Sequence, residues 1–248
     1  MYQNYHKHSH VSNIILADSV STNEDFCKRA VELGHQIISS CEHGTQGNYR
    51  ECATLSEKYN LHWRYVTEAY FVKDRNEKDK TNAHMILAAK TQKGVGDLNY
   101  ILSEANITGY YYRPRIDLDL LLSLDPRDVF ITTACVGGIF RYGYEEAERL
   151  IQIIYRHFKD SFMLEVQYHH TDKQKEVNRF ILSMYRKYGI PLIMGTDSHY
   201  INPEDAALRD QRLEANHIKY EDEEGWFMDM CCSVLYFKRC VCSMYRVN

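Results

Sequence analysis

Short apolar segments alternate with longer amphipathic segments along this 248-residue chain, and this alternation constrains the fold more than any other feature. Residues 83–89, 129–134 and 162–167 have the apolar or β-branched composition of strands. Residues 144–158 and 173–188 have the apolar spacing of amphipathic helices. Strands that alternate with helices of this length are typical of a parallel α/β fold, which we therefore predict.

The remaining segments continue the pattern. Ser21 or Thr22 caps a predicted helix that ends before Gly34, because acidic residues follow the cap and glycine stops helices. We expect further strands or extended segments at 36–41, 63–72 and 190–194, and further helical segments at 49–59, after Gly96 and at 116–124. Nearly every predicted strand end carries a His, Asp, Glu or Cys. In α/β barrels catalytic residues lie at the C-terminal ends of strands, so this distribution indicates a functional site.

Two histidines near the N-terminus, His6 and His8, are the strongest candidate ligands for a metal ion. Residues two apart on a strand project to the same face, and imidazole is the commonest protein ligand for zinc-like metals. Alone, this stretch is equally compatible with polar residues that bind nothing. The metal interpretation gains support from Asp197 and His199, which follow the apolar run at 190–194.

The composition excludes some functions. The net charge is −4, and the pI of about 6.3 gives no overall basic character for tight binding of nucleic acid by this chain alone. No apolar run approaches the ~20 residues that span a bilayer, and no export signal precedes the first histidines, so we expect a cytoplasmic protein. In that compartment the eight cysteines are expected to be reduced thiols.

Seven motifs carry a family resemblance: residues 6–9 (HKHS), 42–44 (EHG), 68–72 (EAYFV), 83–88 (AHMILA), 109–117 (GYYYRPRID), 133–138 (TACVGG) and 195–206 (GTDSHYINPEDA). In this order they resemble the PHP domain (polymerase and histidinol phosphatase) of bacterial C-family replicative DNA polymerases, the DNA polymerase III alpha subunit. The resemblance covers residues from about 3 to 230. It implies a distorted (β/α)7 TIM-like barrel of the PHP superfamily, in agreement with the alternation above.

The resemblance also implies up to three divalent metal ions. The nine implied ligands are His6, His8, Asp18, His43, Glu68, His84, Cys135, Asp197 and His199. Glu68 would bridge a first metal, held with His6, His8 and Asp197, to a second held with His84 and Cys135. Asp18, His43 and His199 would hold the third. The donors suit Zn²⁺ or Mn²⁺, and iron is also compatible; the thiolate favours zinc at its site.

Family members with an intact ligand set are similar to metal-dependent 3'-5' exonucleases that proofread, with Glu68, Asp197 and His199 as the catalytic residues implied here. The expected substrates are DNA 3' ends, bound weakly by this domain alone. The expected partners are the polymerase palm and fingers, in cis or in trans, and other replisome subunits; no membrane is expected. A non-catalytic, metal-stabilised module of a replicative polymerase and a small-molecule phosphatase of the histidinol-phosphatase type remain open.

Several residues depart from the family pattern or have two interpretations. Glu42 stands where the family usually has Asp, so a supporting hydrogen bond could be displaced. His10 is either a solvated loop residue or a contact to metal or substrate, and His169-His170 is either a surface pair or a contact to substrate phosphate. The tyrosine-rich segment that contains Arg113 and Arg115 favours a structural or interface role, and the two arginines are also candidate DNA contacts.

The chain has no room for a polymerase palm. We therefore expect an excised domain, a split gene or a truncated product, with residues 1–230 as the PHP phosphoesterase domain. Residues 231–248 form an irregular Cys-rich tail without zinc-finger spacing.

Overall fold

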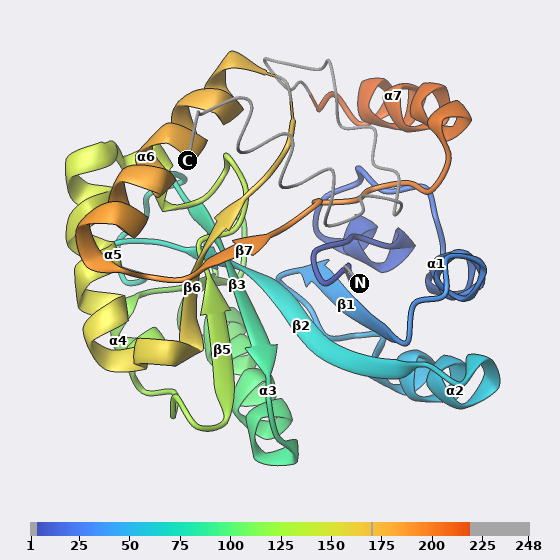
Figure 1. Ribbon diagram of the computed structural model, residues 1–248, viewed down its shortest axis with the longest axis horizontal. Coiled ribbons are helices and arrows are strands. Elements are labelled where there is room, and N and C mark those ends of the chain that lie inside the picture. Colours follow the sequence, from blue (N-terminus) through green and yellow to red (C-terminus); the bar gives the residue numbers. More distant parts are fainter. Residues whose placement is uncertain (1–3, 170, 219–248) are drawn as a thin grey trace.

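The structure is a computed structural model that describes residues 4–169 and 171–218. Its centre is a curled seven-stranded sheet in the order β1-β2-β3-β5-β6-β7, with β4 paired to β2 (Figure 1). The strands are β1 (Ile37–His43), β2 (His62–Phe71), β3 (Ala83–Ala89), β4 (Arg115–Ile116), β5 (Val129–Thr132), β6 (Phe162–Val166) and β7 (Leu192–Met194). This is the architecture of a distorted (β/α) barrel, and the predicted fold class is confirmed.

Helices surround the sheet. Figure 1 shows α4, α5 and α6 on one flank and α1 and α2 on the opposite flank. The α-helices are α1 (Asn23–Glu32), α2 (Tyr49–Tyr59), α3 (Gln92–Ile107), α4 (Leu118–Leu122), α5 (Tyr144–Phe158), α6 (Asp172–Tyr188) and α7 (Ala206–Ala215). The 3-10 helices are η1 (His10–Ile14), η2 (Ile139–Tyr142), η3 (Lys159–Ser161) and η4 (Pro203–Asp205).

The sheet is not entirely parallel, contrary to our prediction. Strand β3 runs antiparallel to both β2 and β5, whereas β1-β2, β2-β4, β5-β6 and β6-β7 are parallel. The reason for the first reversal lies in the connection: residues 72–82 contain no helix, and a parallel neighbour would need a crossover, usually helical. The alternation of segments indicates the strands but not their directions.

The N-terminal segment joins the two ends of the sheet. Lys7 forms an isolated parallel bridge with Ser198, which follows β7. On the other side the Ser39 hydroxyl of β1 donates to the backbone oxygen of Tyr5, at 2.6 Å. The segment therefore lies between β1 and the chain beyond β7, and Lys7 alone among residues 4–9 takes part in a β-bridge.

Two predicted helices have different bounds. Helix α3 begins at Gln92 rather than after Gly96, because the Thr91 side chain caps it by accepting from the Gly94 backbone. The segment predicted as a helix at 116–124 begins in β4, and Asp117 caps the short helix that follows. Helices α2 and α5 and strand β3 have the predicted bounds.

The main core lies between the sheet and helices α3, α5 and α6, and includes Ile131, Ile151, Phe158, Leu164 and Ile181. It lies away from the polar interior described below, so the barrel wall is stabilised independently of the site. None of the helices in the described ranges is long and apolar enough to span a membrane. The predicted tail at 231–248, the boundary at residue 230 and His170 lie outside the described residues.

Candidate metal centre

His6 and His8 project together into the barrel because the backbone between them is paired. The His8 backbone donates to the Ser198 oxygen at 2.7 Å, and the Ser198 backbone donates to the His6 oxygen at 3.1 Å. Lys7 points the opposite way, where its Nζ donates to the Asn23 side chain at 2.8 Å. The alternation expected for residues two apart therefore holds, and both imidazoles are fully buried.

Asp197 follows β7 and faces the same two histidines. Its Oδ1 lies 3.2 Å from the Nε2 of His6 and 3.1 Å from the Nε2 of His8. The backbone at Asp197 has a φ of +53°, in the left-handed region that Asp tolerates better than most residues. Non-glycine residues in this region are concentrated at functional sites.

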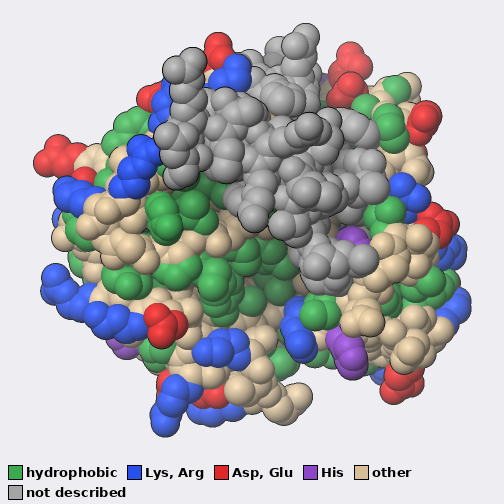
Figure 2. Space-filling model, viewed as in Figure 1, with side chains coloured by type: hydrophobic (Ala, Val, Ile, Leu, Met, Phe, Trp, Pro, Cys, Tyr) green, Lys and Arg blue, Asp and Glu red, His purple; other side chains and the backbone are tan. Residues whose placement is uncertain are grey.

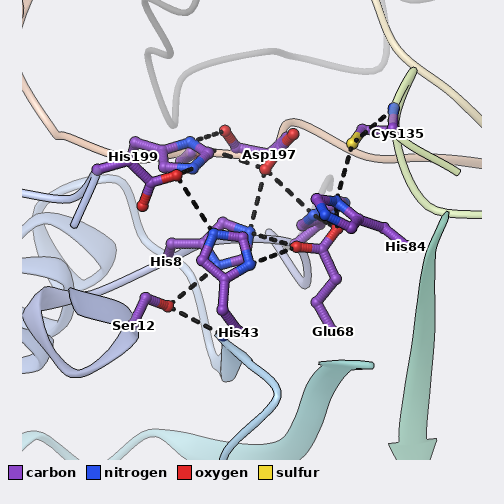
Figure 3. A network of polar contacts seen from close by, with 12 residues as sticks. His8, Ser12, His43, Glu68, His84, Cys135, Asp197 and His199 are labelled. Atoms are coloured by element: carbon purple, nitrogen blue, oxygen red, sulfur yellow. Dashed lines mark hydrogen bonds and ion pairs between the residues drawn. The ribbon is translucent and has the colours of Figure 1, made fainter. Parts of the chain in front are cut away.

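Glu68, near the end of β2, lies at the centre of the cluster (Figure 3). Its Oε1 is 3.5 Å from the Nε2 of His6 and 3.1 Å from the Nδ1 of His84. Its Oε2 is 3.4 Å from the Nε2 of His8 and 2.8 Å from the Nδ1 of His43. One carboxylate thus faces four imidazoles, an arrangement that suits a ligand shared between two cations.

The nine predicted ligands lie in three adjoining groups, which we name after one member of each. The His6 site comprises His6, His8, Glu68 and Asp197; the Cys135 site comprises Glu68, His84 and Cys135; the Asp18 site comprises Asp18, His43 and His199. Ligand atoms lie within 4.8 Å of one another in the Cys135 site and among His6, His8 and Glu68, and also among His8, His43 and His199. Glu68 belongs to both of the first two groups.

In the Asp18 site the carboxylate lies between two imidazoles. The Oδ2 of Asp18 is 3.3 Å from the Nε2 of His43 and 3.2 Å from the Nε2 of His199. The Nδ1 of His199 lies 2.8 Å from the Asp197 backbone oxygen, which leaves its Nε2 facing Asp18. Asp18, which matches the family only loosely in sequence, therefore lies beside His43 and His199.

The Cys135 site depends on a close backbone approach. The Cys135 sulfur lies 3.7 Å from the Nδ1 of His84 and accepts from the Gly137 backbone at 3.3 Å. A Cβ at Gly137 would lie 3.1 Å from that same His84 nitrogen, so any larger residue there would press on the site. The backbone before the cysteine is also left-handed, with a φ of +57° at Ala134.

Several ligand atoms are buried but make no contact with hydrogen-bond geometry to any described residue. They are His6 Nε2, His8 Nε2, His43 Nδ1, both side-chain oxygens of Glu68, and Asp197 Oδ1. Burying such groups without compensation is costly. A cation among them would bind the converging lone pairs, so the donor set of imidazole nitrogens, carboxylates and one thiol fits zinc, manganese or iron.

The pKa values of several side chains in the cluster differ strongly from their ordinary values. Burial would raise the pKa of Glu68, but the charge of His84 and the close polar contacts of His43 and His6 hold it well below its usual value. Burial and the neighbouring His43 lower the pKa of His8 to about 4. His8 is therefore neutral near pH 7, which is the state that binds a metal.

Two other histidines behave differently. Burial acts to lower the pKa of His6, but the Glu165 and Asp197 carboxylates raise it well above its usual value. The pKa of His43 is also raised, because the effects of Tyr70 and Asp18 exceed that of burial. Without a metal, these imidazoles carry protons that balance the carboxylates.

A cavity of about 470 Å³ opens above the ligands. Asp18, His43, Glu68, His84, Cys135, Asp197 and His199 line its floor. Cationic side chains from three separate segments of the chain line it as well: Arg113, Arg141 and Lys173. The cavity therefore combines an acidic, histidine-rich floor with basic groups, as a site for an anionic ligand requires.

The predicted substrate contacts have different outcomes. Arg113 lines the cavity, where its guanidinium lies 5.7 Å from the Tyr70 ring and donates to the Ile15 backbone oxygen. Arg115 is 2% exposed, is not among the cavity residues, and donates to four backbone oxygens of residues 75–79 and 109. Arg115 therefore has a structural role in place of the predicted DNA contact. The sequence alone does not indicate which of the two arginines lines the cavity and which one contacts the backbone.

The predictions for the two remaining histidines also have different outcomes. His10 lies in η1, is exposed and does not line the cavity, in agreement with a solvated loop residue. His169 is buried and lines the cavity. Sequence reasoning missed Arg141, Lys173 and the buried Glu165; Glu165 lies near the end of a predicted strand, where the strand-end rule could have identified it.

Glu42, the departure from the family pattern, supports the N-terminal segment. Its carboxylate accepts from the Ser9 backbone at 3.0 Å, from the Ser9 and Ser12 hydroxyls at 2.6 Å, and from the Asn48 amide at 2.9 Å. The Ser12 hydroxyl in turn lies 3.2 Å from the Nδ1 of His8. The longer side chain thus retains a supporting network beneath the His6 site.

Comparison with known proteins agrees with these features. The profile of the PHP domain family matches residues 4–169. DNA polymerase III subunit alpha of Borreliella burgdorferi is 30% identical over 249 residues, covering 91% of this chain and 22% of the relative. The subunit of Aquifex aeolicus is 31% identical over 217 residues, covering 81% and 18%. The chain spans about a fifth of the length of these curated relatives.

Solved structures share the fold. An amidohydrolase from Chromobacterium violaceum, determined with bound sulfate and no metal, matches with a TM-score of 0.51 and 12% identity over 86% of this chain and 97% of that one. A Bifidobacterium adolescentis protein described as a metal-dependent phosphoesterase matches with a TM-score of 0.50 and 14% identity over 80% and 87%. At these identities the similarity establishes the architecture alone.

Proposed function

The chain belongs to the PHP domain family, and we propose that it hydrolyses phosphodiester bonds at DNA 3' ends with the help of divalent metal ions, as the proofreading-type nuclease domain of a replicative DNA polymerase. The observation that carries this proposal is the position of Glu68, which faces ligands of two adjoining groups on the cavity floor. Zn²⁺ and Mn²⁺ are the proposed metals. The similarity to DNA polymerase III alpha subunits supports the replicative setting.

The ligand groups have the composition that two-metal phosphoesterases use. When bound, such a pair of metals stabilises charge on the phosphate oxygens and lowers the pKa of water. The His6 site and the Asp18 site supply imidazoles and carboxylates, and Cys135 supplies a sulfur that favours zinc. Glu68, Asp197 and His199 are the proposed catalytic residues.

The basic groups along the cavity support a phosphate-containing substrate. Arg113 is held beside the Tyr70 ring, and Arg141 and Lys173 come from η2 and α6. Arginine and lysine bind phosphate through charge-assisted hydrogen bonds, so these side chains are placed to orient a phosphodiester above the ligands. His169, which also lines the cavity, is a further proposed contact.

The surface predicts weak DNA binding by this chain alone. Among the described residues visible in Figure 2, basic and acidic side chains are interspersed. With a net charge of −4, the domain lacks the counterion-release term that supports tight autonomous binding. The polymerase would supply the high local concentration of DNA ends.

The test is a 3'-5' exonuclease assay on a 5'-labelled primer with Mn²⁺ or Zn²⁺, using the wild type, Asp197→Asn and Asp117→Asn. Asp117 is a matched control because its carboxylate is also buried but caps α4, away from the cavity. We expect stepwise shortening by the wild type and Asp117→Asn, and none by Asp197→Asn.

Other results would point elsewhere. Metal binding without hydrolysis of any DNA substrate would favour the non-catalytic, metal-stabilised module. Hydrolysis of a phosphate monoester with no cleavage of the primer would favour a small-molecule phosphatase. Equal nuclease activity in wild type and Asp197→Asn would remove the metal centre from the reaction.

A further inference from the structure

Glu165 on β6 is a buried carboxylate that is not one of the nine predicted ligands. It contacts one of those ligands, His6. Its Oε1 lies 2.6 Å from the Nδ1 of His6, and neither side chain is exposed to solvent. The other imidazole nitrogen of His6, Nε2, faces Glu68 and Asp197. The ring is thus held by Glu165 on one side and directed at the metal site on the other.

Three further groups hold Glu165 itself. Its Oε2 accepts from the hydroxyls of Tyr5 and Thr132, the latter at 3.0 Å, and its Oε1 accepts from the Gln167 amide at 2.7 Å. Together with His6, four polar groups surround this one carboxylate and fix its position.

The chain also leaves space for this carboxylate. A Cβ built at Gly195 would lie 1.8 Å from the Oε1 of Glu165, far inside van der Waals contact. The φ of Gly195 is not in the left-handed region, so backbone conformation does not require glycine at this position. Glycine is therefore needed here to admit the Glu165 side chain, two residues before Asp197.

We infer that Glu165 is a positioning residue that keeps the Nδ1 proton of His6 in place, so that the Nε2 lone pair points at the metal, and that Gly195 is glycine in order to admit it. A carboxylate that accepts from a metal-binding imidazole fixes the tautomer and the orientation of the ring and increases its basicity. Glu165 itself does not touch the metal. The inference rests on the metal centre of the proposed function, but not on its nuclease activity.

The test measures metal binding by calorimetry and the visible spectrum of the Co²⁺-loaded protein, in wild type, Glu165→Gln and Asp117→Asn. Glutamine preserves the shape and the acceptor oxygen but removes the charge. We expect Glu165→Gln to weaken one site by about 10- to 100-fold and to change the Co²⁺ absorption bands, as loss of such a supporting group does elsewhere. The Asp117→Asn control should match the wild type in both.

A double-mutant cycle guards against a general loss of folding. Gly195→Ala alone should weaken metal binding by about tenfold or more, because the new methyl group displaces the carboxylate. In a Glu165→Ala background the same substitution has room and should add little, so the two effects should not be additive. Far-ultraviolet circular dichroism identifies any variant that does not fold.

Three outcomes would overturn all or part of the inference. A Glu165→Gln protein that binds metal as tightly as the wild type, with an unchanged Co²⁺ spectrum, would show that Glu165 does not position His6, while leaving the nuclease proposal intact. A wild-type protein that binds no metal would overturn both. Additive effects of the two substitutions would refute the role assigned to Gly195.

Discussion

Removing metal from the protein should lower its melting temperature. The structure buries three carboxylates, those of Asp18, Glu68 and Asp197, among imidazoles in one small volume. A cation that binds these groups in the folded state only stabilises that state by mass action. At a free metal concentration 100 times the dissociation constant this amounts to about 2.7 kcal/mol for one site.

The corresponding shift is large enough to measure. For a domain of this size 1 kcal/mol changes the melting temperature by about 2–4 °C, so one saturated site should give about 5–11 °C. Thermal unfolding of protein treated with a chelator, with and without added Mn²⁺ or Zn²⁺, measures it. Asp197→Asn should lose most of the shift, and Asp117→Asn should keep it.

The result that would refute this reasoning is an identical melting temperature with and without metal in the wild type. The buried, unaligned ligand atoms would then be compensated by protons alone, and the metal centre would lose its physical basis. A shift of equal size in Asp197→Asn would instead place the stabilising cation elsewhere on the protein.

Three further predictions follow from the site and its surroundings. Because the pKa values of His6 and His43 are raised, a metal ion must displace protons from them when it binds. Metal affinity should therefore increase as the pH rises through and above the ordinary histidine pKa of about 6.5. The calorimetric enthalpy of metal binding should depend on the buffer, and no buffer dependence would contradict this prediction. Arg113→Ala should raise the KM for primer at least several-fold, whereas Arg115→Ala should lower stability in urea with little change in KM, because only Arg113 lines the cavity. Gly94→Ala should destabilise the protein by at least about 1–3 kcal/mol, since its Cβ would lie 2.1 Å from a backbone oxygen of the neighbouring loop; urea unfolding at wild-type stability would refute it.

Much of the fold could be predicted because local signals coincide. Helix α5 was bounded correctly, since its apolar spacing, acidic first turn and basic last turn all agree. The direction of β3 could not be predicted, because it depends on how residues 72–82 return to the sheet and not on the composition of the strand. The start of α3 was not predicted because glycine, here Gly94, usually disfavours a helix. Gly94 packs closely against a loop that is distant in sequence, and a local sequence pattern does not include that contact.

The candidate ligands could be predicted from the sequence more readily than the residues that surround them. Most ligands lie near a strand end or alternate along one segment, so the barrel brings them together at one end. His84 lies at the start of β3, which the antiparallel pairing with β2 brings to the same end. The different roles of Arg113 and Arg115 could not be predicted, because only the folded backbone determines that Arg115 donates to backbone oxygens while Arg113 lines the cavity. Glu165 was not noticed because its contact with His6 joins residues 159 positions apart.

The charge of the ligand set bears on how substrate and metal bind together. Asp18, Glu68, Asp197 and the thiolate form of Cys135 carry four negative charges, and two divalent cations balance them when the histidines are neutral. Even with the carboxylate of Glu165, which is buried against His6, a third cation leaves an excess of positive charge in the cluster, which is costly unless an anion accompanies it. A phosphodiester above the cavity floor, beside Arg113, would be such an anion. Substrate should therefore tighten binding of the last metal, and by thermodynamic reciprocity that metal should tighten binding of substrate by the same factor.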